Sequence, residues 1–199
     1  MMRSGTIPRT GVRFHELMKG WVAVPQASFG DTQRAWFELR ADIFIEDLNG
    51  FLADGCHRGQ LVGKIDFDRV GHSIPATGHV ELFTMSADSA TRLMRYQASF
   101  VANGVEYKMI GTKHVSKSAG PNVWGHTTTL FTTIVRNGSD GYVSVAAGVI
   151  RLSVWQGARM LLTLRGTGSD STAGRMNAVF RFIQFFAREV SAAYLPSRV

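Results

Sequence analysis

Residues 35–45 read AWFELRADIFI, and this stretch decides the fold class of the chain. Every second residue from Ala35 to Ile45 is apolar, whereas the residues between them are mainly charged. A period of two is typical of a β-strand that buries one face and exposes the other to water. The stretch therefore predicts a long amphipathic strand.

A strong hairpin signal lies near the middle of the chain. The pair Asn103-Gly104 separates two β-rich stretches, Arg92–Ala102 and Val105–Val115. Asn-Gly favours a tight hairpin because both central turn residues need a positive φ. Further strands are expected at Gln60–Phe67, Gly78–Met85, Thr127–Val135, Tyr142–Trp155 and Arg159–Arg165, with a turn at Asn137–Gly141.

The C-terminal part has a different period. Apolar residues between Met176 and Val190 recur at helical spacing, and Ser171 or Thr172 can cap the helix. We expect a C-terminal helix over 172–194 and one or two helical turns at Asp47–Ala53. Strands in sequential hairpins followed by one helix predict a mainly β protein. The expected fold is a closed, lipocalin-like antiparallel barrel of eight or nine strands, since closure removes exposed strand edges.

The length of 199 residues fits one domain, of which residues 1–12 are expected to be flexible. A single cysteine, Cys56, excludes an intramolecular disulfide. The chain contains no GxGxxG, GxxxxGK[ST], GxSxG or HExxH motif, so we expect no cofactor and no metal. Without a secretory signal or an apolar run near ~20 residues, a cytoplasmic protein without a membrane span is expected.

The net charge of +7 comes entirely from the second half of the chain. Residues 1–100 hold 11 basic and 11 acidic side chains, whereas residues 101–199 hold 11 basic and 4 acidic ones. The basic residues are never adjacent, and Arg181 with Arg188 forms only a weak stripe. Nucleic-acid binding needs a denser basic surface with exposed aromatic residues, so we do not expect it.

Amphipathic aromatic residues indicate an apolar pocket inside the barrel. Buried Tyr and Trp need hydrogen-bond partners, and Met adapts to irregular ligands. The alternative for any single residue is an ordinary barrel core. The expected ligand-binding residues are Phe83, Met85, Met109, Trp124 and Trp155.

Four polar residues are candidate catalytic groups: Glu81, Tyr96, Tyr107 and His126. A buried Glu81 with a raised pKa could act as a general acid or base. His79 lies two residues before Glu81 and can share its strand face, although a solvated pair at the barrel rim explains the spacing as well.

Several segments also resemble a known family. They are Phe14–Gly20, residues 47–63, Gly78–Met85, Leu93–Tyr96, and Thr127–Phe131 after Trp124. Together they resemble the accessory domain of actinobacterial cholesterol-oxidase-like proteins of the glucose–methanol–choline family. The likeness runs collinearly over about residues 14–190. It implies a β-rich domain associated with sterol-like chemistry.

The likeness departs from the family in one polar loop. Lys117, Ser118, Asn122 and His126 stand where the family pattern has aspartates, so a role of those acids does not transfer. The flavin and hydrolase domains have no counterpart here, so their activities do not transfer either.

Two classes of function follow. The first is a cofactor-independent enzyme that encloses a large apolar polyketide, terpenoid or steroid-like molecule and promotes its cyclisation or isomerisation. The second is a non-catalytic carrier of such a ligand, or a docking partner of a separate oxidoreductase. The sequence also allows a homodimer.

Overall fold

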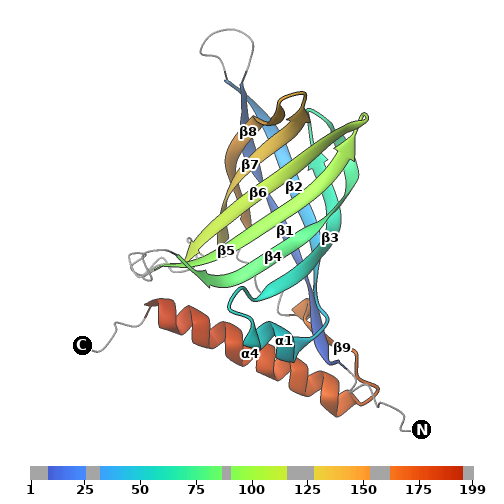
Figure 1. The fold of residues 1–199 in the computed structure, drawn as a ribbon, viewed down its shortest axis with the longest axis vertical. Coiled ribbons are helices and arrows are strands. Elements are labelled where there is room, and N and C mark those ends of the chain that lie inside the picture. Colours follow the sequence, from blue (N-terminus) through green and yellow to red (C-terminus); the bar gives the residue numbers. More distant parts are fainter. Residues whose placement is uncertain (1–8, 26–31, 87–90, 116–127, 153–161, 195–199) are drawn as a thin grey trace.

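The structure is a computed structural model that describes residues 9–25, 32–86, 91–115, 128–152 and 162–194 (Figure 1). Among these residues lie the helices α1 (Leu48–Ala53) and α4 (Thr172–Tyr194). The strands are β1 (Gly11–Pro25), β2 (Thr32–Ile45), β3 (Arg58–Phe67), β4 (Gly71–Met85), β5 (Arg92–Ala102), β6 (Val105–Val115), β7 (Thr129–Gly138), β8 (Gly141–Leu152) and β9 (Arg165–Thr167).

Strands β1 to β8 form a closed antiparallel barrel. Each strand pairs with the next along the chain, and β1 pairs with both β2 and β8, which closes the sheet. The short β9 pairs with the beginning of β1, from Gly11 to Arg13. The expectation of a mainly β, closed barrel with a C-terminal helix is confirmed.

The alternation at residues 35–45 separates the barrel interior from its surface. Phe37, Leu39, Ala41 and Ile43 on β2 are fully buried, whereas the alternate residues Glu38, Arg40 and Asp42 are only partly buried. Phe37 packs edge-on against Phe67 of β3, with ring centroids 5.6 Å apart. These inward-facing side chains therefore belong to the apolar core of the barrel.

Glycines on five strands occupy alternate positions that would otherwise point a side chain into the barrel, in phase with the buried residues. They permit tight coiling of the strands. A Cβ at Gly63 would overlap the Arg40 carbonyl oxygen, and a Cβ at Gly78 would overlap the Gln97 carbonyl oxygen. Glycine therefore lets neighbouring backbones approach more closely than any side chain would permit, as barrel closure requires. The in-phase glycines include one on each of these five strands, namely Gly20, Gly63, Gly78, Gly111 and Gly148.

Some strand boundaries differ from those expected. Gly11 and Val12, expected in a flexible segment, belong to β1, where Val12 pairs with both Ile45 and Gly166 and is buried. β4 begins at Gly71, seven residues before the expected start at Gly78, since Gly71–Thr77 pair with β3. The expected strand at Arg159–Arg165 is wrong over 162–164, because Leu162 and Thr163 are helical and β9 begins only at Arg165.

Helix α4 lies across one end of the barrel, with α1 beside it (Figure 1). Asp47 caps α1 by accepting hydrogen bonds from the Asn49 and Gly50 amides, both at 3.0 Å. Phe185 of α4 is buried against Phe51 of α1, with ring centroids 5.3 Å apart. Aromatic packing thus fixes both helices over this end of the barrel.

The boundaries of α4 agree with the sequence analysis, and Ser171 accepts a hydrogen bond from the Gly174 amide at 3.4 Å, as an N-cap does. Among the residues that the structure describes, neither helix is long and apolar enough to cross a bilayer.

Candidate functional site

Tyr96 lies inside the barrel and contacts a buried lysine. Only 2% of Tyr96 is exposed, and the same holds for Lys113. Lys113 Nζ donates a hydrogen bond to Tyr96 Oη at 3.0 Å and lies 4.6 Å from the centre of the ring. One ammonium group therefore contacts both the hydroxyl and the π face of the tyrosine.

Glu16 reaches the same lysine from another wall of the barrel. Its Oε2 lies 3.9 Å from Lys113 Nζ, and its side chain is almost as buried as that of the lysine. β1, which carries Glu16, is separated from β6, which carries Lys113, by β7 and β8 in the sheet. The ion pair therefore crosses the interior. We call Glu16, Tyr96 and Lys113 the interior triad.

Burial shifts the proton equilibria of the interior triad. Loss of water around the ammonium lowers the pKa of Lys113, and the charge of Glu16 opposes this shift only in part. Burial, and then the negative charge of Glu16, raise the pKa of Tyr96 well above its usual value. Tyr96 therefore keeps its proton at physiological pH, while Lys113 releases its proton more easily than a lysine in water.

One oxygen of the interior triad lacks a hydrogen bond. Among the described residues, no donor reaches Glu16 Oε2 within hydrogen-bond geometry. Proteins rarely leave a buried acceptor unsatisfied, because desolvation then goes uncompensated. Glu16 Oε2 can thus accept a hydrogen bond from a group that enters the interior.

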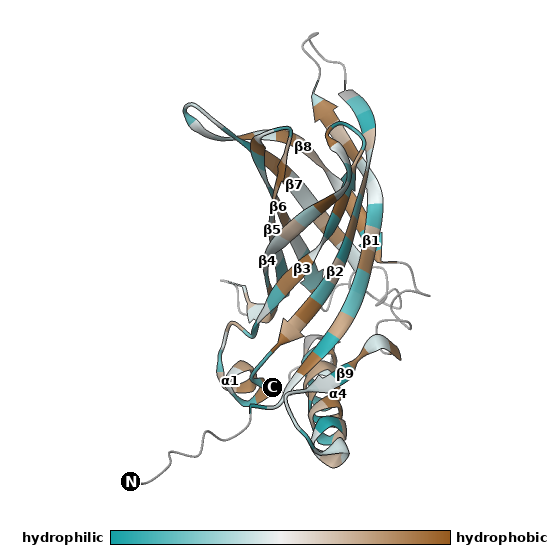
Figure 2. Cartoon of the chain, turned by 90° about the vertical axis from the view of Figure 1, so that its right-hand side faces the viewer, coloured by the Kyte–Doolittle hydropathy of each residue, from teal (hydrophilic) through white to brown (hydrophobic). Residues whose placement is uncertain are grey.

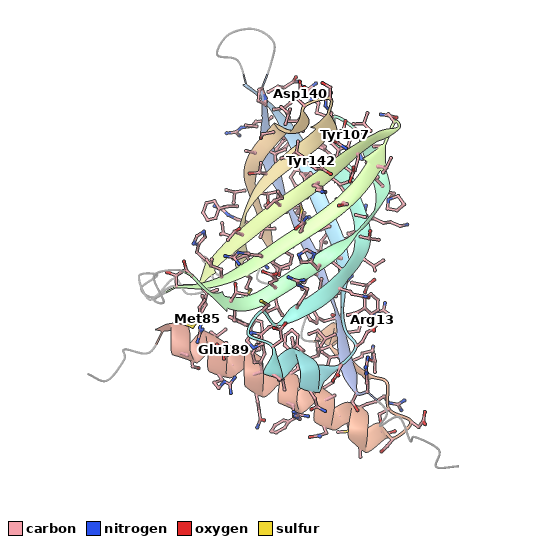
Figure 3. All side chains as sticks on the ribbon, viewed as in Figure 1. Arg13, Met85, Tyr107, Asp140, Tyr142 and Glu189 are labelled. Atoms are coloured by element: carbon pink, nitrogen blue, oxygen red, sulfur yellow. The ribbon has the colours of Figure 1, made fainter. Side chains whose placement is uncertain are left out.

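Two other expected site residues, Tyr107 and Met109, lie on β6. Met109 is fully buried, and Tyr107 is half-buried and stacks on Phe100, with centroids 5.3 Å apart. Figure 3 places Tyr107 toward the end remote from α4, near the turn between β7 and β8. Tyr107 therefore lies near the opposite end from α4, while Tyr96 is the fifth of the eleven residues of β5.

Glu81 faces outward with a side chain that is 12% exposed, and its pKa is lowered, so the expected raised pKa is wrong. Its Oε1 accepts a hydrogen bond from Arg58 Nη2 at 2.7 Å, and its Oε2 lies 3.5 Å from Arg95 Nη1. The hydrogen bond from Arg58 is the main cause of the lowered pKa of Glu81, although partial burial opposes it. Its ion-pair partners are therefore these two exposed arginines and not His79.

The remaining expected site residues are not brought into the interior triad. Phe83 is buried at a β-bulge with φ of 55° and packs against Phe186 of α4, with centroids 5.0 Å apart. Met85 is 54% exposed and lies near the α4 end (Figure 3), so its expected place in a pocket is wrong. His126, Trp124 and Trp155 lie outside the described residues.

Sequence reasoning missed Glu16 and Lys113 as site residues, although the sequence contains a signal for both. Glu16 stands between buried Phe14 and Met18 in the alternation of β1, and Lys113 stands in phase with buried Met109 and Val115 of β6. A charged residue in the buried phase of a strand marks a polar group inside the fold.

A polar hollow lies on the surface beside α1. It encloses about 270 Å³ and includes Arg9, Asp47, Asp54 and Arg58 in its lining. This mixed charge does not suit an apolar ligand. Within the described parts of the chain, no three His, Cys, Asp or Glu side chains lie close enough together to hold a metal ion.

Fold and site together define a closed eight-stranded antiparallel barrel with a buried polar triad in an apolar interior. No protein-family model matches the chain, and the comparisons with curated proteins and with solved structures found no match. The resemblance to the cholesterol-oxidase-like accessory domain and the homodimer remain predictions.

Proposed function

We propose that this chain is a cofactor-independent barrel enzyme that encloses an apolar small molecule and promotes its isomerisation or cyclisation. The observation that carries the proposal is the interior triad, a buried Glu–Lys–Tyr cluster in an apolar core. The substrate classes remain those expected from the sequence: polyketide, terpenoid or steroid-like.

A contribution to the stability of the fold is a weak explanation for a buried ionic cluster. Desolvating a carboxylate and an ammonium offsets most of their attraction, so well-packed apolar residues often serve a core equally well. Strongly shifted pKa values of buried groups, by contrast, gather at functional sites. Within the described part of the chain, Glu16 Oε2 adds an acceptor that has no hydrogen bond.

The chemistry that this geometry favours is proton transfer next to a carbonyl. Tyr96 stays protonated and donates its O–H to the carbonyl oxygen of the substrate. Lys113, once it has released its own proton, takes a proton from the neighbouring carbon and returns it to a second carbon, which moves the double bond and restores the amine. Glu16 stabilises the ammonium that forms in between. A general base is most efficient when its pKa lies near the working pH, and burial moves Lys113 in that direction.

The apolar walls supply the other part of the proposed catalysis. A substrate held in one conformer among the buried side chains keeps its reacting atoms close, which lowers the entropic part of the barrier. The same walls suit a carrier, so the catalytic role rests on the interior triad and not on the barrel.

Native mass spectrometry of the purified protein is the first test, because a retained apolar ligand reveals a binding cavity and its mass. Thermal stabilisation by a panel of sterols, terpenoids and polyketides is the second readout. Retention or stabilisation supports the proposal. Failure of both would contradict it and favour the docking alternative.

An isomerisation assay separates enzyme from carrier. Cholest-5-en-3-one is a suitable probe because its conversion to the conjugated ketone changes its ultraviolet absorbance. If the chain binds this ketone, we expect wild type and Lys64→Met to convert it and Lys113→Met to lose most of the rate. Lys64 is an exposed lysine on β3 and is the matched control. Equal conversion by all three would remove Lys113 from the mechanism, and tight binding without conversion would favour the carrier.

A further inference from the structure

Helix α4 exposes apolar side chains on the face that points away from the barrel. Met176 is 68% exposed, Phe180 58% and Ile183 42%. These residues lie at positions i, i+4 and i+7, so they form one row along the helix. We call them the outer stripe. The opposite face, with Ala178, Phe182 and Phe185, is the one buried against the barrel end.

The charged groups of α4 are almost all cationic. The helix carries three arginines and one acid, Glu189. Glu189 is buried, and its Oε2 lies 3.3 Å from Arg92 Nη2 while its Oε1 lies 3.1 Å from Arg188 Nη2. The Arg188 side chain is nevertheless 70% exposed. The solvent side of α4 therefore combines large apolar residues with positive charge and offers no unpaired acid.

We propose that the outer stripe docks the barrel end onto an anionic lipid surface, with α4 lying in the headgroup region. Basic helices with one exposed apolar face bind bilayers in this way, since the apolar side chains enter the acyl boundary and the arginines contact anionic headgroups. Arg181 donates a hydrogen bond to Asn49 Oδ1 of α1 at 2.8 Å, whereas Arg175 and Arg188 are exposed and can contact anionic headgroups. The inference goes beyond the proposed function and does not depend on it.

The dimensions of the outer stripe favour a lipid surface over a second copy of the chain. The three residues span about 10 Å of helix, at 1.5 Å per residue. A stable protein interface needs about 800 Å² from each partner, much more than one short row of side chains offers. A bilayer accepts a narrow convex stripe without a matching groove. Among the described elements, no other helix or strand lies on the outer side of α4, which crosses the barrel end (Figures 1 and 2).

Flotation with lipid vesicles tests the proposal. The full chain is mixed with phosphatidylcholine vesicles or with vesicles of phosphatidylcholine and phosphatidylglycerol, and the floated fraction is measured. We expect the wild type to float with the anionic vesicles, with at least tenfold weaker binding to the neutral ones and a marked loss in high salt. The triple variant Met176→Gln, Phe180→Gln, Ile183→Gln should bind at least tenfold more weakly.

A matched control replaces apolar residues that are equally exposed but lie at the other end of the barrel. The variant Val101→Gln, Val143→Gln changes 61% and 55% exposed residues of β5 and β8 and should float like the wild type. Circular dichroism checks that every variant is folded. The proposal is wrong if the wild type does not float, or if the triple variant floats equally well. A third outcome also contradicts the proposal: light scattering finds a dimer for the wild type and a monomer for the triple variant, and neither protein binds vesicles. The outer stripe would then be a dimer interface.

Discussion

Glu16 Oε2 on β1 and Lys113 Nζ on β6 lie 3.9 Å apart inside the barrel, with almost no exposure of either side chain to water. Lys113 at the same time donates a hydrogen bond to Tyr96 Oη. Each of the three groups supplies a polar contact to another one, and the surrounding apolar side chains cannot supply such a contact.

Replacement of Lys113 by methionine should destabilise the fold strongly. The substitution leaves the Glu16 carboxylate buried without a counter-charge, and breaking a buried pair in this way costs about 3 kcal/mol or more. The double variant Glu16→Gln, Lys113→Met should recover a good part of this loss. Urea denaturation at pH 7 measures both free energies of unfolding. Equal stability of the single and double variants would show that the two residues are not coupled.

Tyr96 should make the fold sensitive to alkaline pH. Its folded pKa is raised well above 10.0, so the folded protein keeps the phenol proton at a pH where the unfolded chain releases it. The resulting stabilisation is complete below pH 10.0 and is lost as pH rises above it. In Tyr96→Phe the free energy of unfolding should fall less steeply above this pH. Parallel curves for both proteins would contradict the assignment.

Glu81 should tolerate substitution, because it lies in a partly exposed network outside the barrel. Exposed ion pairs contribute at most about 1 kcal/mol, so Glu81→Gln should change stability at neutral pH only slightly. The lowered pKa of Glu81 stabilises the fold above pH 4.5, and this contribution is lost as pH falls toward the folded pKa. The variant should therefore show a weaker acid dependence and unchanged ligand retention. Loss of ligand would return Glu81 to the candidate site.

Gly78 should be intolerant of any side chain. Gly78→Ala places a methyl group against the Gln97 carbonyl oxygen of the neighbouring strand, which forces the backbones apart and should cost about 2 kcal/mol. Gly55→Ala is the control, since nothing lies within 4 Å of a Cβ there. Thermal unfolding of the two variants compares them directly, and similar melting temperatures would argue against glycine-dependent coiling.

Phe185 should anchor α4 to the barrel end. Its ring contacts His57 at 4.7 Å and Phe83 at 5.8 Å between centroids, so Phe185→Ala opens a cavity and should cost about 3 kcal/mol. Phe180→Ala removes the same side-chain volume from an exposed position and should change stability little. Hydrogen exchange across α4 should rise only in the first variant. A similar response of both variants would show that α4 packs differently.

Much of the local structure could be predicted from short patterns. The alternation at 35–45, the hairpin at Asn103-Gly104 and the boundaries of α4 all follow from interactions between residues close in sequence. The alternation of residues along a strand, however, defines two faces and does not identify which face points into the barrel. Glu81 illustrates this limit, since its neighbour Val80 occupies the buried phase of β4 and turns the glutamate outward.

Local sequence patterns specify the long strands, the sharp turns between them and the amphipathic C-terminal helix. Each of these features depends on residues within a few positions of one another. The tertiary structure alone decided that Glu16 meets Lys113 and Tyr96. Their contact depends on the closure of β1 onto β8 and on the stagger of the strands around the barrel. Backbone pairings between distant segments set that geometry, and in-phase glycines such as Gly78 allow it.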